Sequence, residues 1–274
     1  MEVEELKQAL VPLLPYCLPL IVASVALEWY LTRHDEARRY AARDFRASLG
    51  IGIGNALLNV GLKTGILTFG LFFCALAPWR VPAMWWAWVL AYLVVDLCNY
   101  LAHYAAHKQR LWWATHVTHH SSEHLNLSTA FRSSWTQHAK IIFFIPAWLT
   151  GIPPVILFTC YEINLLYQFW IHTESIGRLP GWVEYVFVTP SHHRVHHGCN
   201  PRYIDKNFGS SLIIWDRLFG TFQEETERPV YGITKPLVSQ SLLYLNFHEW
   251  RDLWHDLRRA RTLRKRLQLL FGPP

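Results

Sequence analysis

Histidines are grouped in this chain in a way that leaves its fold little freedom. Between residues 103 and 197 lie 12 of the 15 histidines, and ten of these fall into short groups. They form four groups: His103-x3-His107, His116-x2-His119-His120, the separate His172, and His192-His193-x2-His196-His197. Neutral imidazole is the commonest side-chain metal ligand, and ten imidazoles exceed what one ion accepts. The pattern therefore predicts two metal ions and a fold that brings the four groups together.

Spacing within the groups is typical of helices that present ligands on one face. His103 and His107 are four residues apart, which is about 6 Å along a helix axis. The second and third groups share the spacing H-x-x-H-H, which offers ligands to two adjacent ions. We include His192 among the ligands, although the repeated spacing does not need it. Ten histidines in this arrangement favour a metal centre over scattered structural histidines.

Four apolar zones surround these groups, at roughly 10–32, 47–77, 83–102 and 139–171. The first is long enough for a membrane-spanning helix. The second is rich in glycine, which suits close helix packing in a bilayer, and the third begins with tryptophans, as an interfacial belt does. The fourth is broken by Gly151, Pro153 and Pro154, which indicates a helical hairpin that dips into the bilayer. We predict an all-α integral membrane bundle of about four to five spans, including the hairpin.

The charge pattern indicates which side of the membrane holds the histidines. The formal net charge is +6, but no nucleic-acid-binding signature is present and the basic residues stand beside apolar spans. The loop after the first zone carries five arginines, which predicts a cytoplasmic loop: Arg33, Arg38, Arg39, Arg43 and Arg46. The parity of the following spans then places all four histidine groups in a cytoplasmic, metal-binding cap close to the bilayer.

Three parts follow from this organisation. Residues 1–102 form the N-terminal spans, and 103–238 form the catalytic part with the hairpin 139–171. Residues 239–274 form a basic amphipathic C-terminal part, in which 248–270 is predicted to be one helix lying on the membrane. The alternative is a solvated surface helix. His34, His248 and His255 fall outside any ligand spacing and are predicted to lie on the surface.

Beyond these patterns, the sequence resembles a known family. The boxes H-x3-H, H-x-x-H-H and H-x-x-H-H are those of the fatty acid hydroxylase superfamily of membrane di-iron enzymes. The similar text runs from about Asp96 to Glu225 and includes LLYQFWIHTESIG and PSHHRVHHGCNPRYIDKNFGSSLIIWDRLFGTF. These two stretches look most like the alkylglycerol monooxygenase branch and its bacterial sterol-desaturase-like relatives. The boxes identify the superfamily well but the lipid poorly, because they bind metal and oxygen.

The resemblance implies which residues bind metal. From the three boxes come His103, His107, His116, His119, His120, His193, His196 and His197, and His172 matches the family's separate histidine. Relatives often have His or Asn four residues before that histidine, where this chain has Gln168. A neutral amide there would hold a water on one metal, so one ion would be more open than the other.

Polar residues near the boxes are candidates for supporting the ligands. A ligating histidine usually donates its other N–H to a carboxylate or carbonyl. The candidates are Asp96, Asn99, Glu174, Asp205, Asn207 and Asp216. Asp96 lies inside an apolar zone, where an ionisable group is costly and usually functional, so we include it with Gln168 among the catalytic residues. A helix–helix hydrogen bond is an equally weighted role for Asp96.

The expected function is that of a membrane di-iron monooxygenase that uses O2 to hydroxylate or desaturate a lipid C–H bond. The branch implies an ether lipid, with tetrahydrobiopterin as reductant; sterol desaturase and fatty acid hydroxylase are the alternatives. No Rossmann or flavin motif is present, so an external electron donor is expected. Zinc or another metal would also bind these imidazoles. The non-oxygenase alternative is a metal-binding or transport membrane protein, which would line a path through the bilayer.

Overall fold

The computed structural model describes residues 3–10, 13–34 and 40–274. Within these residues it contains fifteen helical segments and no β-strand. Two isolated β-bridges join Phe187 to Leu212 and Gly198 to Tyr231. The all-α prediction is therefore confirmed for the described part of the chain.

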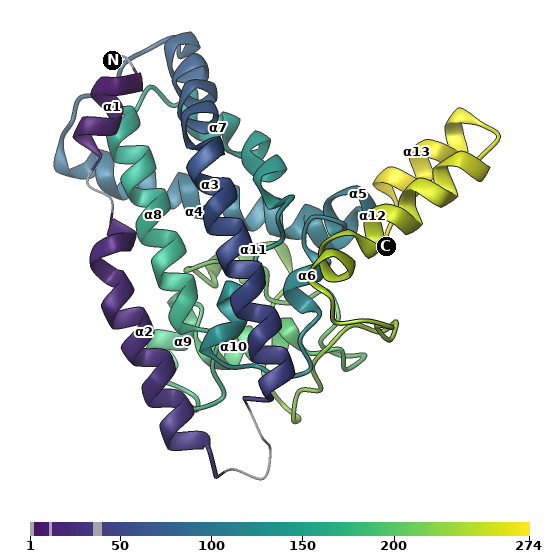
Figure 1. The fold of residues 1–274 in the computed structure, drawn as a ribbon. Helices are drawn as coiled ribbons and strands as arrows, with labels where there is room; N and C mark the ends of the chain where they lie inside the picture. Colours follow the sequence, from purple (N-terminus) through teal and green to yellow (C-terminus); the bar gives the residue numbers. More distant parts are fainter. Residues whose placement is uncertain (1–2, 11–12, 35–39) are drawn as a thin grey trace.

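Long helices form the body of the molecule (Figure 1). They are α2 (Leu13–Thr32), α3 (Ala42–Leu76), α4 (Trp85–Lys108) and α8 (Pro154–Trp170). Of these, α3 and α4 are long and apolar enough to cross a membrane, and Tyr16–Thr32 is a shorter apolar helix. Leu57 and Val60 on α3 are 69% and 80% exposed, as lipid-facing side chains would be. The count of four to five spans stays a prediction.

The packing of α4 against α8 builds the main apolar core. Small residues of α4, among them Ala87 and Ala91, are fully buried against Ile156 and Leu157 of α8. Small side chains let two helix backbones approach closely, and this is how apolar helices associate in a bilayer. Cys160 of α8 is buried in the same core. The short α1 (Val3–Ala9) packs at the other side of α8 through Leu6.

The fourth apolar zone reverses direction at the predicted break. It consists of the 3₁₀ helix η2 (Gln137–Phe144), α7 (Ile145–Trp148) and α8. Gly151 has φ +74°, and a Cβ there would lie 2.5 Å from the carbonyl oxygen of Trp79. Only glycine fits this turn. The first arm is short and mostly 3₁₀ rather than α-helical, and its insertion into a bilayer stays a prediction.

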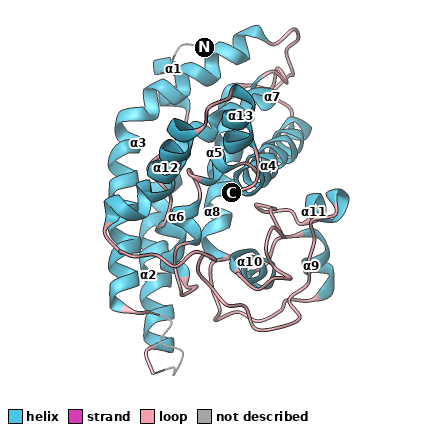
Figure 2. Ribbon diagram, turned by 90° about the vertical axis from the view of Figure 1, so that its right-hand side faces the viewer, coloured by secondary structure: helices cyan, strands magenta, loops and turns pink. Residues whose placement is uncertain are grey.

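Short helices joined by loops accompany the long helices (Figure 2). They are α5 (Arg110–Trp113), α6 (Val117–His120), η1 (Leu127–Phe131), α9 (Gly181–Val186), α10 (Pro190–His197) and α11 (Ile214–Phe219). Of these, α6 and α10 carry the histidines of the second and third groups, apart from His116, the N-cap of α6. The start of α10 has Thr189 as its N-cap and Pro190 in the first turn, where a proline costs no hydrogen bond. The main-chain N–H of His193 then donates to the carbonyl of Thr189.

The C-terminal part differs from the prediction of one helix over 248–270. It forms two helices, α12 (Leu242–Arg259) and α13 (Leu263–Phe271), because the helix ends at Ala260 and Thr262 caps the next one. The two project from the body at the right of Figure 1. The start of α12 is anchored in the protein, since Leu245 is buried with Ala47 and Ile51 of α3.

The prediction of a surface position is wrong for His248. This residue lies in the anchored half of α12 and is only 6% exposed; its Nδ1 donates to the carbonyl of Tyr244, 3.0 Å away. His34 and His255 are exposed, as expected. In the arginine-rich loop, Arg38 and Arg39 lie outside the described residues, so the cytoplasmic orientation stays a prediction.

Candidate metal centre

Nine of the ten predicted ligands converge into two adjacent groups. The five-histidine group consists of His103, His107, His116, His120 and His196. The four-histidine group consists of His119, His172, His193 and His197. Within each group, one nitrogen atom of every ring lies within 4.8 Å of those of the others. The structure thus assembles two potential metal sites from residues that span almost a hundred positions of sequence.

The H-x-x-H-H spacing explains why the two groups are neighbours. In α6 and its N-cap, the first and last histidines of the box join the five-histidine group and His119 joins the other. In α10, His196 joins the five-histidine group, whereas His193 and His197 join the other. Adjacent residues on a helix point about 100° apart, so each box serves both sites. The end of α4 supplies His103 and His107, and His172 follows two residues after the end of α8.

The Nε2 atoms face one another at the centre of each group. His103 and His116 Nε2 are 2.9 Å apart, and His120 and His196 Nε2 are 3.1 Å apart. In the four-histidine group, His193 Nε2 lies 2.8 Å from that of His172 and 3.0 Å from that of His197. A chain of such contacts cannot be satisfied by protons alone, because each neutral ring has one donor and one acceptor nitrogen.

Main-chain carbonyls fix the tautomers of three ligands. Nδ1 of His103 donates to the Phe208 carbonyl and Nδ1 of His196 to the Lys206 carbonyl, both at 2.9 Å. Nδ1 of His172 donates to the Gln168 carbonyl at 2.7 Å. A carbonyl can only accept, so the proton is on Nδ1 and the lone pair of Nε2 points into the group. This is the arrangement that a metal ion requires.

The 205–208 segment supports only the five-histidine group. Asp205 and Asn207 have φ of 61° and 55°, in the left-handed region that asparagine and aspartate tolerate best. Each left-handed residue is followed by one whose carbonyl accepts from a histidine: Lys206 from His196, and Phe208 from His103. The Asp205 carboxylate also lies 3.6 Å from Nδ1 of His107 and 2.6 Å from Nζ of Lys108. Burial raises the pKa of Asp205, but His107 and Lys108 outweigh it and hold the pKa at about 2.

Two buried ring nitrogens have no hydrogen-bond partner among the described residues, Nε2 of His107 and Nδ1 of His193. An unsatisfied buried nitrogen is costly unless something outside the chain occupies it. His107 belongs to a cluster whose other Nε2 atoms converge, so a metal ion would satisfy it. The donor set therefore fits two metal ions with imidazole ligands.

The imidazoles are also held in the form that binds metals. Burial, with added repulsion from neighbouring positive groups, lowers the pKa well below its usual value in six rings: His116, His119, His120, His193, His196 and His197. These rings are neutral near pH 7, and a neutral ring offers its lone pair without first losing a proton.

The structure does not bring His192 into either group. Its Nδ1 lies 3.3 Å from the main-chain N–H of Thr189 and accepts from it, which completes the capping box at the start of α10. Its ring packs edge-on against Phe222. His192 therefore stabilises the helix that carries three ligands, and its side chain points away from them.

Asp96 and Gln168 belong to one buried hydrogen-bond network beside the centre. Asp96 accepts from Asn164, from Ser211 twice, from Trp215 and from the N–H of Leu212. Gln168 donates from Nε2 to Oδ1 of Asn164 at 2.9 Å. All the donors to Asp96 come from α8 and the 211–215 segment, which matches the helix-joining role weighed above. The amide nitrogen of Gln168 is tied back into α8, while its main-chain carbonyl orients His172.

The other polar candidates are distributed around the centre. Asp216 accepts from the N–H groups of Phe208 and Gly209 at 2.7 Å each, so it holds the segment whose carbonyl orients His103. Asn99 donates to Asn164 and joins the Asp96 network. Glu174 accepts from the hydroxyl of Tyr231 at 3.1 Å.

Sequence reasoning missed two kinds of functional residue. Lys206 and Phe208 act through main-chain carbonyls, which leave no side-chain signal. Glu28 of α2 is buried and accepts from the N–H of Leu127 and from the hydroxyl of Thr173, the residue after His172. A carboxylate inside an apolar zone was the signal that would have identified it.

Comparisons with known proteins find a family model and several relatives of similar sequence. Residues 88–221 match the family model described as fatty acid hydroxylase. The chain is 38% identical to an alkylglycerol monooxygenase of Danio rerio over 99% of this chain and 60% of the relative. It is 39% identical to that of Homo sapiens over 88% of this chain and 54% of the relative. It is 42% identical to that of Xenopus tropicalis over 72% of this chain and 43% of the relative. The chain thus spans about half the length of these relatives, and no solved structure matches it significantly.

Proposed function

We propose that this chain, whose residues 88–221 match the fatty acid hydroxylase family model, is a membrane di-iron oxygenase of that family that uses O2 to hydroxylate a lipid C–H bond. The observation that carries the proposal is the pair of histidine groups, in which nine imidazoles direct nitrogen atoms at two neighbouring points. The names of the relatives suggest the lipid class, a glycerol lipid with an ether-linked alkyl chain.

The residues have distinct tasks in this proposal. The two groups would hold one iron ion each, and a bound iron pair supplies the oxygen activation that an unreactive C–H bond requires. The carbonyls of Lys206, Phe208 and Gln168 keep the protons of three ligands on Nδ1. The apolar core between α4 and α8 excludes water from the interior of the helices whose ends lead to His103, His107 and His172. Desaturation of the same C–H, and a sterol or fatty acid substrate, are the alternatives within the family.

The clustering of the imidazoles argues against a metal transporter. Transport requires ligands spaced along a path across the bilayer. Here the ligands from four separate segments lie within two adjoining groups. Such a compact centre suits an enzyme, and the match to the fatty acid hydroxylase family model favours that role. Zinc would occupy the same imidazoles without supplying oxygen chemistry.

Electron supply and orientation complete the proposal. The histidine groups face the cytoplasm, where an external donor reaches them; tetrahydrobiopterin is the donor that the family resemblance implies. The exposed arginines that the structure describes in the 33–46 loop support this side, under the positive-inside rule.

Metal analysis with oxygen uptake tests the proposed function. The full chain is purified in nanodiscs, loaded with ferrous iron without oxygen, and given O2, a reductant and one of three lipids: an alkylglycerol, a fatty acid or a sterol. We expect about two ions per chain from the two groups, and product formation that requires iron. His119→Ala should abolish turnover and His255→Ala should not. Product formation with zinc, or none with any lipid, would contradict the proposal.

A further inference from the structure

Two buried carboxylates on the N-terminal helices have no part in the function described so far. Glu28 lies near the end of α2 and is 5% exposed, and Asp44 lies in the first turn of α3 and is 8% exposed. An ionised carboxylate is costly to bury unless hydrogen-bond donors surround it. Ionisable groups in apolar helices usually have a function. The contacts of the two carboxylates indicate what that function is.

Glu28 joins α2 to the segment that follows His172. Its carboxylate accepts four hydrogen bonds, which come from the hydroxyl groups of Thr173, Ser175 and Tyr40 and from the main-chain N–H of Leu127. Burial and the Glu28 carboxylate raise the pKa of Tyr40, so this hydroxyl keeps its proton and donates. The four donors satisfy the carboxylate, and one of them belongs to Thr173, the residue next to a metal ligand.

Thr173 is also held from the opposite direction, by α10. The guanidinium of Arg194 donates to the Thr173 carbonyl at 3.2 Å. Two further bonds of 2.7 Å each fix this guanidinium to the carboxylate of Glu225. Arg194 lies in α10 between His193 and His197, which are ligands of the four-histidine group. The segment after His172 is therefore fixed between α2 and the helix that carries two further ligands of the same site.

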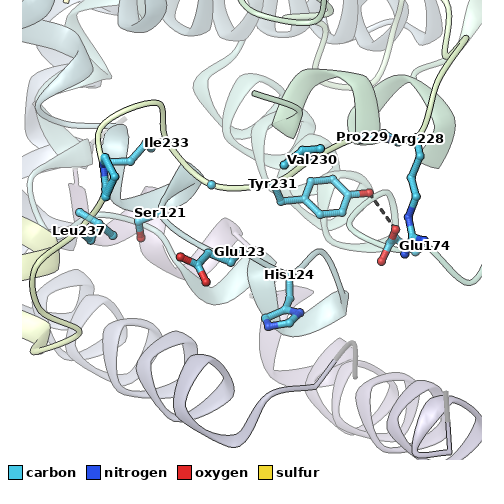
Figure 3. Close-up of a pocket in the computed structure, with 12 residues that line it drawn as sticks. Ser121, Glu123, His124, Glu174, Arg228, Pro229, Val230, Tyr231, Ile233 and Leu237 are labelled. Atoms are coloured by element: carbon cyan, nitrogen blue, oxygen red, sulfur yellow. Dashed lines mark hydrogen bonds between the residues drawn. The ribbon is translucent and has the colours of Figure 1, made fainter. Parts of the chain in front are cut away.

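Asp44 makes the corresponding link from α3 to the segment that follows His120. Its Oδ2 accepts from the hydroxyl of Ser122 at 2.7 Å, and its Oδ1 accepts from Nη2 of Arg132 at 2.9 Å. Arg132 is fully buried, and its Nη1 donates to the hydroxyl of Ser121 at 2.9 Å. Figure 3 shows Ser121 on this segment, beside the N-terminal helices at the bottom of the view. One buried ion pair thus holds both residues that follow a ligand of the five-histidine group.

We propose that each of these helices positions one of the two metal sites, Glu28 of α2 the four-histidine group and Asp44 of α3 the five-histidine group. Ligands have to be held within about 0.5 Å of the productive geometry, and a ring is only as fixed as the main chain that carries it. Because the metal centre is part of the function proposed above, this assignment rests on it and names its positioning residues. Helices α2 and α3 then have a task at the centre besides any contact with lipid.

Site-selective loss of metal tests the assignment. The full chain is loaded with zinc, and the dissociation constants of both ions are measured by competition with a chelator. Glu28→Gln keeps the shape of the side chain but replaces an acceptor oxygen with an NH2 group, which cannot accept from a donor. We expect it to weaken the binding of one ion by about 10–100-fold, and Asp44→Asn to weaken the other by a similar factor. Thr173→Val and Ser122→Ala each remove one hydroxyl only, and should weaken the same two ions by less.

Chemical modification identifies which ion is lost. A bound metal protects its ligands from diethyl pyrocarbonate, and mass spectrometry identifies the modified rings. At a free zinc concentration that fills both sites of the wild type, Glu28→Gln should leave His193 reactive and His103 protected. Asp44→Asn should leave His103 reactive and His193 protected. Loss of the same ion in both variants, equal loss of both ions, or no loss in either variant would overturn the assignment.

Matched variants separate positioning from general destabilisation. Glu162→Gln makes the same change in α8, where the carboxylate accepts from the main-chain N–H of Leu13, and should leave both dissociation constants unaltered. Ile156→Ala opens a cavity in the core between α4 and α8. It should lower the midpoint of thermal unfolding and keep both ions. If Ile156→Ala weakens one ion as much as Glu28→Gln does, the carboxylate acts through stability alone and the assignment is wrong.

The metal-free protein keeps this assignment separable from the proposed function. If the wild type oxidises no lipid or binds fewer than two ions, the rates at which diethyl pyrocarbonate modifies the metal-free rings still report their positions. His172 and His120 are both buried, so both should react slowly in the wild type. Glu28→Gln should speed the modification of His172 alone, and Asp44→Asn that of His120 alone. Unaltered rates for both rings in both variants would contradict the positioning itself.

Discussion

The five-histidine and four-histidine groups are built from the same boxes but supported differently. In the first, the 205–208 segment offers two carbonyls and a carboxylate to three ligands. In the second, only His172 has an acceptor for its Nδ1 among the described residues, the Gln168 carbonyl. Nδ1 of His193 is buried and has no hydrogen-bond partner among them. Supporting contacts orient ligands and raise their basicity. Two sites with the same ligand chemistry therefore need not hold their ions equally well.

Removing one ligand from each group should have the largest effect. We expect His196→Ala and His119→Ala both to abolish lipid oxidation, because each removes an imidazole that no neighbour replaces. His119→Ala should also leave about one metal ion per chain, since it leaves three ligands in the group with less support. Mass-spectrometric metal analysis and turnover check this. Two full ions in His119→Ala would contradict the weaker metal binding expected of the four-histidine group.

Chelation should separate the two ions in time. The ion in the four-histidine group has fewer ligands and fewer supporting contacts, so we expect it to leave first. Loss of metal during dialysis against a chelator should be biphasic, with about one ion per phase. A single phase for both ions would show that the two sites are equivalent.

Asp205→Asn should affect the five-histidine group alone. The change keeps the shape of the side chain but removes the charge beside His107 and Lys108. Loss of such a supporting group typically costs about 10–100-fold in metal affinity or activity. Metal titration should show one weakened site. Asp252→Asn on α12, where the carboxylate pairs with Lys235, is the control and should change neither site.

Gln168→Ala should have a smaller effect in the four-histidine group. It removes the side-chain bond to Asn164 but keeps the main-chain carbonyl that orients His172. We expect both metals to remain, with turnover reduced by about tenfold or less. Loss of one ion would mean that the Gln168 side chain itself is needed for metal binding.

His192→Ala should have the smallest effect on the centre. It removes the acceptor for the N–H of Thr189 at the start of α10. The loss of a helix cap costs about 1 kcal/mol of stability. We expect two metals and near-normal turnover, with a lower midpoint of thermal unfolding. If a metal is lost instead, His192 is a ligand after all.

Much of the centre was predictable from spacing. The boxes identified eight of the nine converging histidines, because i, i+3 and i+4 positions share a helix face whatever the rest of the fold does. The ninth, His172, was identified by the family resemblance. The helical class and the reversal near Gly151 were predictable for the same reason, since periodicity and turn residues act locally. The C-terminal part was predicted to contain one helix over 248–270 and contains two, because apolar spacing alone does not reveal the cap at Thr262.

The sequence by itself determined which histidines could form a metal centre, because metal chemistry and helix periodicity leave few alternatives; of the ten it predicted, nine converge. Only the tertiary structure decided how those ligands are shared between two groups and which group is better supported. The carbonyls of Lys206 and Phe208 are invisible as side chains, and they reach the ligands because Asp205 and Asn207 adopt left-handed backbone conformations. His248 was predicted to lie on the surface, but it is buried because the first half of α12 packs against α3. Burial and main-chain direction depend on contacts between distant segments, which no local pattern contains.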